Sequence, residues 1–235
     1  MSARFLEQVV LVAGGTGGLG KAVSLAFLQE SATVVVTYRD QKEFDALLSA
    51  TGAKTPRLEG QRVDVTDELA VSRFIAGVSA KYGRLDVLVN AVGGYAGGNK
   101  LWESDARILD QMLALNLRSG YLLSRAVVPA MLRQGHGAIV NVASTAAIDH
   151  PAALAEYAAS KAAAVAMIDS LAADLRDTGV RVNSVLPSII DTEANRKAMP
   201  NADYAKWPKP EDIASVILFL CSADAKLVRG AAIRV

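Results

Sequence analysis

Short apolar runs alternate with amphipathic stretches along the whole chain. The run at residues 33–37 is entirely β-branched, which is typical of a parallel strand covered on both faces. Residues 68–82 instead repeat apolar positions at helical spacing. The pattern predicts strands at 8–13, 33–37, 61–65, 85–90, 138–142, 180–186 and 231–235. It predicts helices at 21–30, 42–49, 68–82, 105–132, 156–176 and 210–221.

This regular alternation of strand and helix predicts the fold class. We expect a single α/β domain over residues 1–235, doubly wound and of the Rossmann type, with about seven parallel strands and helices on both faces. No Ser/Pro-rich linker, charge block or internal repeat divides the chain. In such sheets ligands bind beyond the carboxyl ends of the strands, so residues that follow strands are the first candidates for chemistry.

The composition narrows the range of partners. The chain has 235 residues with 25 basic and 24 acidic side chains, a formal net charge of +1, which predicts no broad surface for nucleic acid or an anionic membrane. Charges interrupt every long apolar run, so no membrane span is expected. The single cysteine, Cys221, predicts a reducing, cytoplasmic location and a buried side chain. His136 and His150 are isolated, so no metal site is expected.

A glycine-dense turn at residues 14–20 follows the first predicted strand and opens the first predicted helix. Glycines let a backbone approach a pyrophosphate closely, and a helix N-terminus offers free N–H groups and a positive dipole end. The glycines fit two registers, one that starts at Gly14 and one that starts at Gly15, and a merely flexible loop is the alternative. The candidate dinucleotide contacts in this turn are Gly14, Thr16, Gly18, Leu19 and Gly20.

The end of the second predicted strand bears on the choice between NAD and NADP. An acidic residue there would bind the ribose 2′-hydroxyl of NAD, whereas an arginine would pair with the 2′-phosphate of NADP. Tyr38 stands where the acid is expected and Arg39 follows it, which favours NADP over NAD. Asp40 could cap the next helix or take the place of the acid, and Arg39 could be an ordinary solvated charge.

Tyr157 and Lys161 are spaced i and i+4, which places them on one face of a predicted helix. A free tyrosine has a pKa of about 10, too high for efficient base catalysis at neutral pH, and a nearby cation is expected to lower it. This spacing alone is common by chance. Ser144 follows a predicted strand and precedes Tyr157 by thirteen residues, and its hydroxyl could hold a substrate oxygen near the phenol. A simple turn serine is the alternative.

Together, these motifs resemble the short-chain dehydrogenase/reductase family in its compact single-domain form, over residues 8–235. The resemblance implies an NAD(P)-dependent enzyme that transfers hydride between nicotinamide and a carbonyl or alcohol carbon. It implies that Tyr157 is the acid/base and that Lys161 lowers its pKa and positions the cofactor. Ser144 would then orient the substrate oxygen, and Asn116 would support a water-linked proton relay to the lysine.

The resemblance also implies which residues bind the cofactor. It assigns the glycine motif to the register that starts at Gly14. Ala91 and Val92 depart from the family pattern, so a side-chain amide that usually steadies the centre of the sheet is missing, and Ser188 replaces a glycine. Besides the glycine turn and Arg39, the implied cofactor contacts are Asp64 and Val65 at the adenine, and Asn90, Ala91, Gly93, Tyr157, Lys161, Pro187, Ile190 and Thr192.

Family members are usually homotetramers or homodimers, which implies self-association. Residues 158–173 carry alanines on nearly all sides, as expected of a helix that is buried, here against a copy of itself. Residues 189–209 are where a substrate lid is expected. Met199, Tyr204 and Trp207 in that lid could cover an apolar or aromatic group, or could simply pack on the sheet.

Two other functions fit parts of the same sequence. Residues 93–98 resemble the segment after the fourth strand of dihydropteridine reductase, a relative that reduces a pterin and lacks the catalytic serine. A pterin reductase is therefore one alternative. A catalytically silent NADP(H)-binding sensor or scaffold is the other, and the intact Ser144, Tyr157 and Lys161 argue against it.

Overall fold

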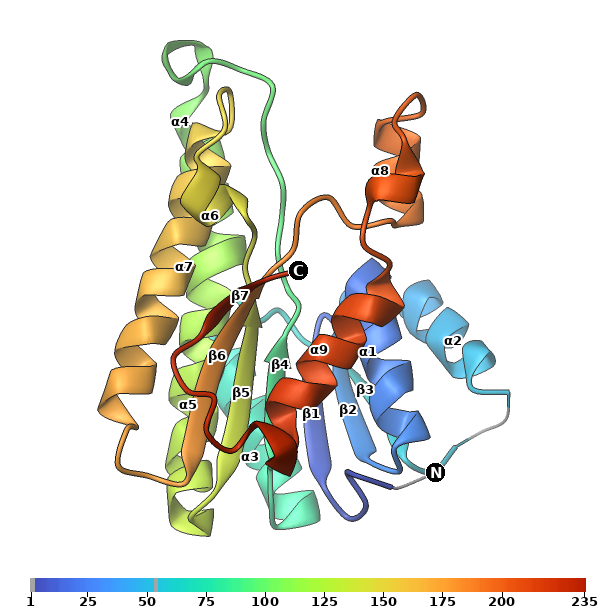
Figure 1. The fold of residues 1–235 in the computed structure, drawn as a ribbon. Coiled ribbons are helices and arrows are strands. Elements are labelled where there is room, and N and C mark those ends of the chain that lie inside the picture. The colour runs from blue at the N-terminus through green and yellow to red at the C-terminus, as the bar shows by residue number, and fades with distance from the viewer. Residues whose placement is uncertain (1–2, 53–54) are drawn as a thin grey trace.

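Parallel strands form one sheet through the centre of the molecule (Figure 1). The strands are β1 (Val9–Ala13), β2 (Thr33–Tyr38), β3 (Leu58–Arg62), β4 (Val87–Asn90), β5 (Gly137–Val142), β6 (Val180–Leu186) and β7 (Ala232–Arg234). This computed structural model of the chain describes residues 3–52 and 55–235. The seven strands follow the order β3-β2-β1-β4-β5-β6-β7, so the direction of winding reverses between β1 and β4. That reversal is the switch point at which doubly wound sheets bind ligands.

Helices cover both faces of the sheet (Figure 1). The longer ones are α1 (Gly18–Gln29), α2 (Gln41–Ala50), α3 (Glu68–Tyr82), α5 (Ser119–Gln134), α7 (Ala155–Asp174) and α9 (Pro210–Cys221). Buried side chains of α1, α2 and α9 pack on one face, and those of α3, α5 and α7 pack on the other. Shorter helices are α4 (Ala106–Leu113), α6 (Ala146–Asp149) and α8 (Glu193–Ala198). The predicted single-domain, doubly wound α/β fold is confirmed.

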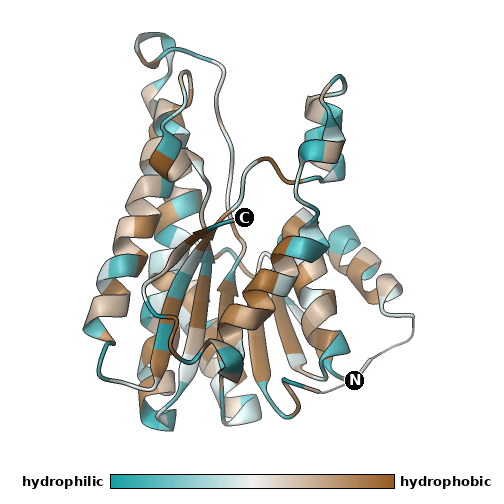
Figure 2. Cartoon of the chain, viewed as in Figure 1, coloured by the Kyte–Doolittle hydropathy of each residue, from teal (hydrophilic) through white to brown (hydrophobic). Residues whose placement is uncertain are grey.

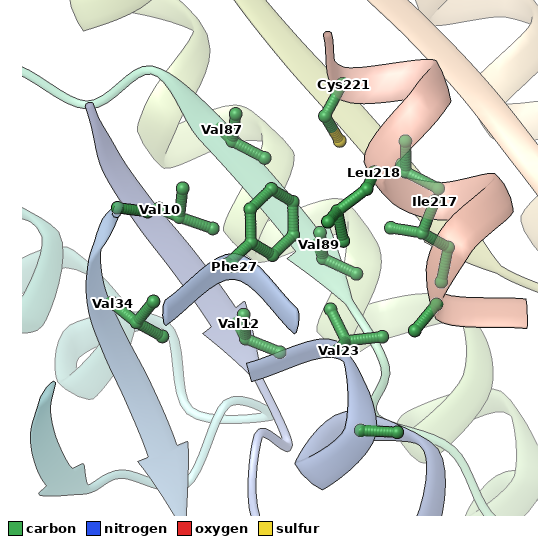
Figure 3. Packing of buried hydrophobic residues seen from close by; sticks show 14 of the residues in the cluster. Val10, Val12, Val23, Phe27, Val34, Val87, Val89, Ile217, Leu218 and Cys221 are labelled. Carbon is green, nitrogen blue, oxygen red and sulfur yellow. The ribbon is translucent and has the colours of Figure 1, made fainter. Parts of the chain in front are cut away.

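Hydrophobic residues concentrate on the strands, as Figure 2 shows, and one cluster of buried side chains fills the space between the sheet and the layer of α1 and α9. In Figure 3, Phe27 of α1 lies among valines from β1 and β4, with Leu218 of α9 beside it. Removal of such apolar surface from water is the main force that stabilises the fold. Cys221 is buried, as predicted, and burial raises the pKa of its thiol to about 12. The thiol is therefore protonated and unreactive at neutral pH.

The predicted third strand lies earlier in the chain than expected. The prediction was 61–65, but the paired segment is β3, at Leu58–Arg62. Val63 and Val65 are buried although they follow the strand, because both pack with the apolar side chains beneath α3. Their hydrophobicity reflects this packing in the loop rather than strand pairing.

The long helix predicted at 105–132 is interrupted. After α4, residues Ala114–Arg118 form a π-helical turn, and α5 follows it. A periodic pattern of apolar residues cannot reveal one extra residue in a helical turn, so the sequence predicted a continuous helix. Asn116 is the buried residue of this turn, and such turns often occur at functional sites.

Within residues 3–52 and 55–235, no helix is both long enough and apolar enough to traverse a bilayer. The same residues contain no group of three or more His, Cys, Asp or Glu side chains arranged to hold a metal ion.

Candidate active site

Hydrogen bonds hold the glycine turn against the end of β2. The amide of Gly14 donates to Thr37 Oγ1 at 3.0 Å, and the amide of Gly15 donates to the carbonyl oxygen of Thr37 at 3.2 Å. Ser24 Oγ of α1 donates to the carbonyl oxygens of Gly15 and Gly20. The turn is therefore rigidly placed where α1 begins, so the free N–H groups of the helix N-terminus have a defined position.

Close packing in this turn leaves room only for glycine. Gly14 has a φ of +70°, a conformation that other residues rarely adopt. A Cβ at Gly20 would collide with the carbonyl oxygen of Gly14, and a Cβ at Gly18 would lie 2.7 Å from Thr192 Cγ2. The segment that follows β6 thus touches the glycine turn. Because the glycines carry no side chain and the turn meets that segment, these residues fit a dinucleotide that spans the switch point.

The end of β2 carries the residues expected to choose between NAD and NADP. The Asp40 carboxylate accepts a hydrogen bond from the Lys42 amide at 2.9 Å, so it caps α2, which is one of its two predicted roles. The Tyr38 ring stacks on Phe44 with 4.9 Å between centroids, and its hydroxyl donates to Gln41 Oε1 at 2.7 Å. No acidic side chain takes the place of Tyr38 in this arrangement.

Arg39 is exposed at the same end of β2. The pKa of Asp64 is held below its usual value, chiefly by hydrogen bonds from Thr66 and to a smaller extent by the charge of Arg39. Glu43 was not predicted as a site residue, yet its carboxylate accepts a hydrogen bond from Thr16 Oγ1 at 2.8 Å. Its place in the first turn of α2, next to the end of β2, is the sequence signal that could have identified it.

A cleft beyond the carboxyl ends of the central strands gathers many of the predicted cofactor residues. The predicted residues that line it are Gly14, Thr16, Arg39, Asp64, Val65, Ala91 and Gly93. Glu43 and Leu115 also line it and were not predicted. Arg39, Asp64 and Val65, which are predicted to bind the adenosine half of a dinucleotide, therefore share one cleft with Ala91 and Gly93, which follow β4.

The other predicted cofactor residues lie around this cleft with different environments. Leu19 is buried in the layer of α1, and Pro187 is buried at the end of β6, where its carbonyl accepts from the Thr145 amide. Ile190 packs partly on the same core. Asn90 is almost fully buried, and its amide donates to Asn141 Oδ1 across the sheet at 2.9 Å. The side chain of Asn90 thus steadies the sheet beside Ala91.

The structure brings Ser144, Tyr157 and Lys161 together. Ser144 follows β5, Tyr157 and Lys161 lie one turn apart on α7, and the Ser144 side chain lies near enough to the Tyr157 phenol to influence its pKa. The ammonium of Lys161 lies 6.0 Å from the centre of the Tyr157 ring and donates to the Val142 carbonyl at 3.1 Å. A hydroxyl, a phenol and an ammonium thus converge at the carboxyl end of β5, a set that can bind an oxygen and exchange a proton with it.

The pKa of Tyr157 is raised, which differs from the prediction that Lys161 lowers it. Burial is the largest cause, the nearby Ser144 side chain acts in the opposite direction, and Tyr95 raises the pKa further. Burial also lowers the pKa of Lys161 to about 8. Desolvation thus dominates both pKa values, and Tyr157 is a neutral phenol at neutral pH.

Asn116 lies in the π-helical turn and connects this site to the loop after β4. Its Oδ1 accepts from the Gly94 amide at 2.8 Å, and its Nδ2 donates to Ser160 Oγ at 2.9 Å. Ser160 in turn donates to the carbonyl oxygen of Tyr157 at 2.7 Å. Ser160 was not predicted as a site residue, although its place directly before Lys161 could have identified it. A chain of hydrogen bonds therefore runs from the loop to the backbone of α7.

The sequence and fold match one known family. A family profile described as "short chain dehydrogenase" matches residues 8–203, most of the chain. This chain belongs to the short-chain dehydrogenase/reductase family. It is similar to a 3-oxoacyl-(acyl-carrier-protein) reductase, FabG, of Thermotoga maritima, with 33% identity over 97% of this chain and 95% of that protein. A 2-(S)-hydroxypropyl-CoM dehydrogenase of Xanthobacter autotrophicus is 33% identical over 100% of this chain and 97% of its own.

Solved structures of the short-chain dehydrogenase/reductase family agree with this membership. ElxO with NADP bound superposes with a TM-score of 0.92 at 28% sequence identity, covering 97% of this chain and 96% of that one. The match in sequence and fold extends over nearly the whole of both chains, and it shows that this family member is an NAD(P)-dependent oxidoreductase.

Proposed function

We propose that this family member reduces a carbonyl compound, or oxidises the corresponding alcohol, with Tyr157 as the acid/base. The observation that carries the proposal is the meeting of Ser144, Tyr157 and Lys161 at the end of β5, beside a cleft lined by the glycine turn. The two relatives described above are named as a reductase of a 3-oxoacyl group and a dehydrogenase of a hydroxypropyl group, which supports carbonyl/alcohol chemistry.

A bound nicotinamide dinucleotide supplies the hydride for reduction and accepts it in the reverse direction. The raised pKa keeps the Tyr157 phenol protonated at neutral pH, so it can give its proton to the carbonyl oxygen as the carbon gains hydride. The Ser144 hydroxyl, which lies beside this phenol, holds the substrate oxygen in place. The oxygen thus gains a proton as fast as it gains negative charge.

The proton that Tyr157 gives up must be replaced from water. Lys161 lies one helical turn away, and its pKa of about 8 allows its ammonium to exchange protons near neutral pH. Asn116 orders the loop beside Lys161, since a Cβ at Gly93 would lie 3.0 Å from Asn116 Oδ1 and 3.1 Å from Lys161 Nζ. We assign Asn116 the role of supporting a water-linked route to Lys161.

We also propose that NADP is preferred over NAD through Arg39. The exposed guanidinium of Arg39 lines the cleft, and no carboxylate replaces Tyr38 at the position that would bind a ribose 2′-hydroxyl. Arg39 can pair with a 2′-phosphate. Glu43 lines the same cleft, and its carboxylate accepts a hydrogen bond from the Thr16 hydroxyl. The negative charge of this carboxylate opposes binding of that phosphate.

Variants at these two positions are expected to shift cofactor affinity in opposite directions. Arg39→Ala should weaken NADPH binding by about ten-fold and leave NADH binding nearly unchanged, because only NADPH loses a charge pair. Glu43→Gln should strengthen NADPH binding by a few-fold, because a like charge is removed. Fluorescence titration of each variant with NADPH and NADH measures these constants. Equal weakening of both cofactors in Arg39→Ala would contradict the assignment.

We propose further that residues 1–235 act as one cytoplasmic domain that assembles into a homodimer or homotetramer. The apolar side chains of Leu113, Leu117, Tyr121 and Met167 line a surface groove between the region of α4 and α5 and helix α7. A second copy of this chain could cover this groove and the alanine-rich α7 together. The molar mass in solution, from light scattering, tests this assembly.

The proposed function is tested by a panel of carbonyl compounds and alcohols assayed with NADPH and NADH in parallel. We expect turnover of carbonyl substrates, with NADPH the better cofactor. A quinonoid dihydropterin belongs in the panel, because activity on it alone would favour the pterin reductase alternative. Tight NADPH binding without turnover of any compound would overturn the proposal.

A further inference from the structure

The loop between β4 and α4 is fastened to the start of the helix that carries Tyr157. The Gly98 amide donates to the Ala153 carbonyl at 2.9 Å. Gly97 packs so closely on Leu154 that a Cβ there would collide with the leucine side chain. The position of this loop is therefore set by the segment that leads directly into α7, so side chains of the loop have a defined place relative to Tyr157.

Tyr95 is the side chain of this loop that reaches the catalytic tyrosine. Its ring meets the Tyr157 ring edge-on, with 5.1 Å between centroids and 64° between planes. A Cβ at Gly97 would lie 2.9 Å from the Tyr95 hydroxyl oxygen and 3.2 Å from Cζ, so the ring rests on bare backbone. Tyr95 is nonetheless 68% exposed. Its ring is held between Gly97 and Tyr157 while much of its surface remains open beside the reacting phenol.

The aromatic residues of the lid are engaged with each other. The rings of Tyr204 and Trp207 lie 5.0 Å apart, and the Arg196 guanidinium lies 4.8 Å from the centre of the Tyr204 ring. The Tyr204 hydroxyl donates to the Met199 carbonyl at 3.1 Å. These contacts join lid residues to one another, whereas packing on the sheet was one of the two predictions for the lid. Within residues 3–52 and 55–235, the aromatic ring that contacts Tyr157 is that of Tyr95.

We propose that Tyr95 determines substrate specificity by stacking on a planar, conjugated group attached to the substrate carbonyl, so that aryl and other conjugated ketones or aldehydes are the preferred class. This inference rests on the proposed function and names its substrate class. An aromatic face attracts another flat π-system in an offset stack, which a saturated ring of the same size cannot form. A tyrosine held in place also binds with little loss of conformational freedom.

The test compares acetophenone with cyclohexyl methyl ketone, which are similar in size but differ in the planarity of the ring. The enzyme is saturated with NADP⁺ or NAD⁺, whichever binds more tightly, so that neither ketone can be reduced, and ligand-observed NMR measures each dissociation constant. We expect acetophenone to bind about five-fold more tightly. Tyr95→Phe should keep this preference, and Tyr95→Ala should abolish it.

Trp102→Ala is the matched control, because Trp102 belongs to the same connection, is 78% exposed and contacts Lys100 rather than the phenol. Its preference for acetophenone should equal that of the wild type. Equal affinity for both ketones in the wild type, a preference that survives Tyr95→Ala, or no saturable binding of either ketone would overturn the inference. Since turnover plays no part, failure of the carbonyl panel would contradict the proposed function separately.

Discussion

Tyr157→Phe is expected to lower kcat by roughly a thousand-fold while leaving the affinity for the cofactor within about two-fold of wild type. The substitution removes only the phenol hydroxyl beside Ser144, so the substrate oxygen loses its proton donor. The ring remains to fill its place against Tyr95 and beside Lys161. Steady-state rates on the best substrate of the panel, together with fluorescence titration of the cofactor, separate the chemical step from binding.

Tyr82→Phe provides the control for this experiment. Tyr82 lies on α3, outside the cleft, and is also partly buried. Its hydroxyl donates to the carboxylate of Glu59 on β3 at 2.6 Å. Its removal should leave kcat unchanged, which would show that loss of a tyrosine hydroxyl does not by itself impair the enzyme. Turnover of Tyr157→Phe at the rate of wild type would contradict the assignment of Tyr157 as the acid/base.

Arg181→Ala is expected to reduce the free energy of unfolding by about 3 kcal/mol. Arg181 lies on β6 and is only 8% exposed. Its guanidinium donates to the carbonyl oxygens of Leu220 at 2.6 Å, Ser222 at 3.0 Å and Ala225 at 3.1 Å. It therefore binds backbone acceptors at and beyond the end of α9. Alanine would remove all three hydrogen bonds, and among the described residues only the Ser222 and Ala225 carbonyls would still accept from backbone amides, those of Ala225 and Val228. Urea denaturation followed by circular dichroism measures the change.

Two further variants sharpen this result. Arg181→Lys keeps the charge but offers a single ammonium in place of a planar fork, so it should recover only part of the lost stability. Arg133→Ala removes an exposed arginine near the end of α5 and should change the free energy of unfolding by less than about 0.5 kcal/mol. If Arg181→Ala were as stable as Arg133→Ala, the guanidinium would not be what secures the end of α9.

Local patterns in the sequence were enough to predict the class of fold and most of its elements. The β-branched run at residues 33–37 became β2, and residues 68–82 became α3, because each pattern matches one type of backbone geometry. The glycines that begin at Gly14 predicted a bare turn between strand and helix, which the structure shows. The proposed catalytic pair could also be found by spacing, since Tyr157 and Lys161 are neighbours on any helix.

The sequence could not predict features that depend on segments distant in the chain. The bond between Thr16 and Glu43, the meeting of Tyr95 with Tyr157, and the carbonyls that Arg181 binds all join separate elements. No local periodicity encodes such contacts.

The pKa of Tyr157 shows most clearly which properties follow from the sequence and which follow from the fold. Sequence spacing placed a cation near the phenol, and from that we predicted a lowered pKa. The fold buries both groups, and the cost of placing a charge away from water raises the pKa of Tyr157 and lowers that of Lys161. That Tyr157 and Lys161 are neighbours was therefore determined by the sequence alone, through helical geometry. Their protonation and their neighbours were decided by tertiary structure, because burial and contact exist only once the chain is folded.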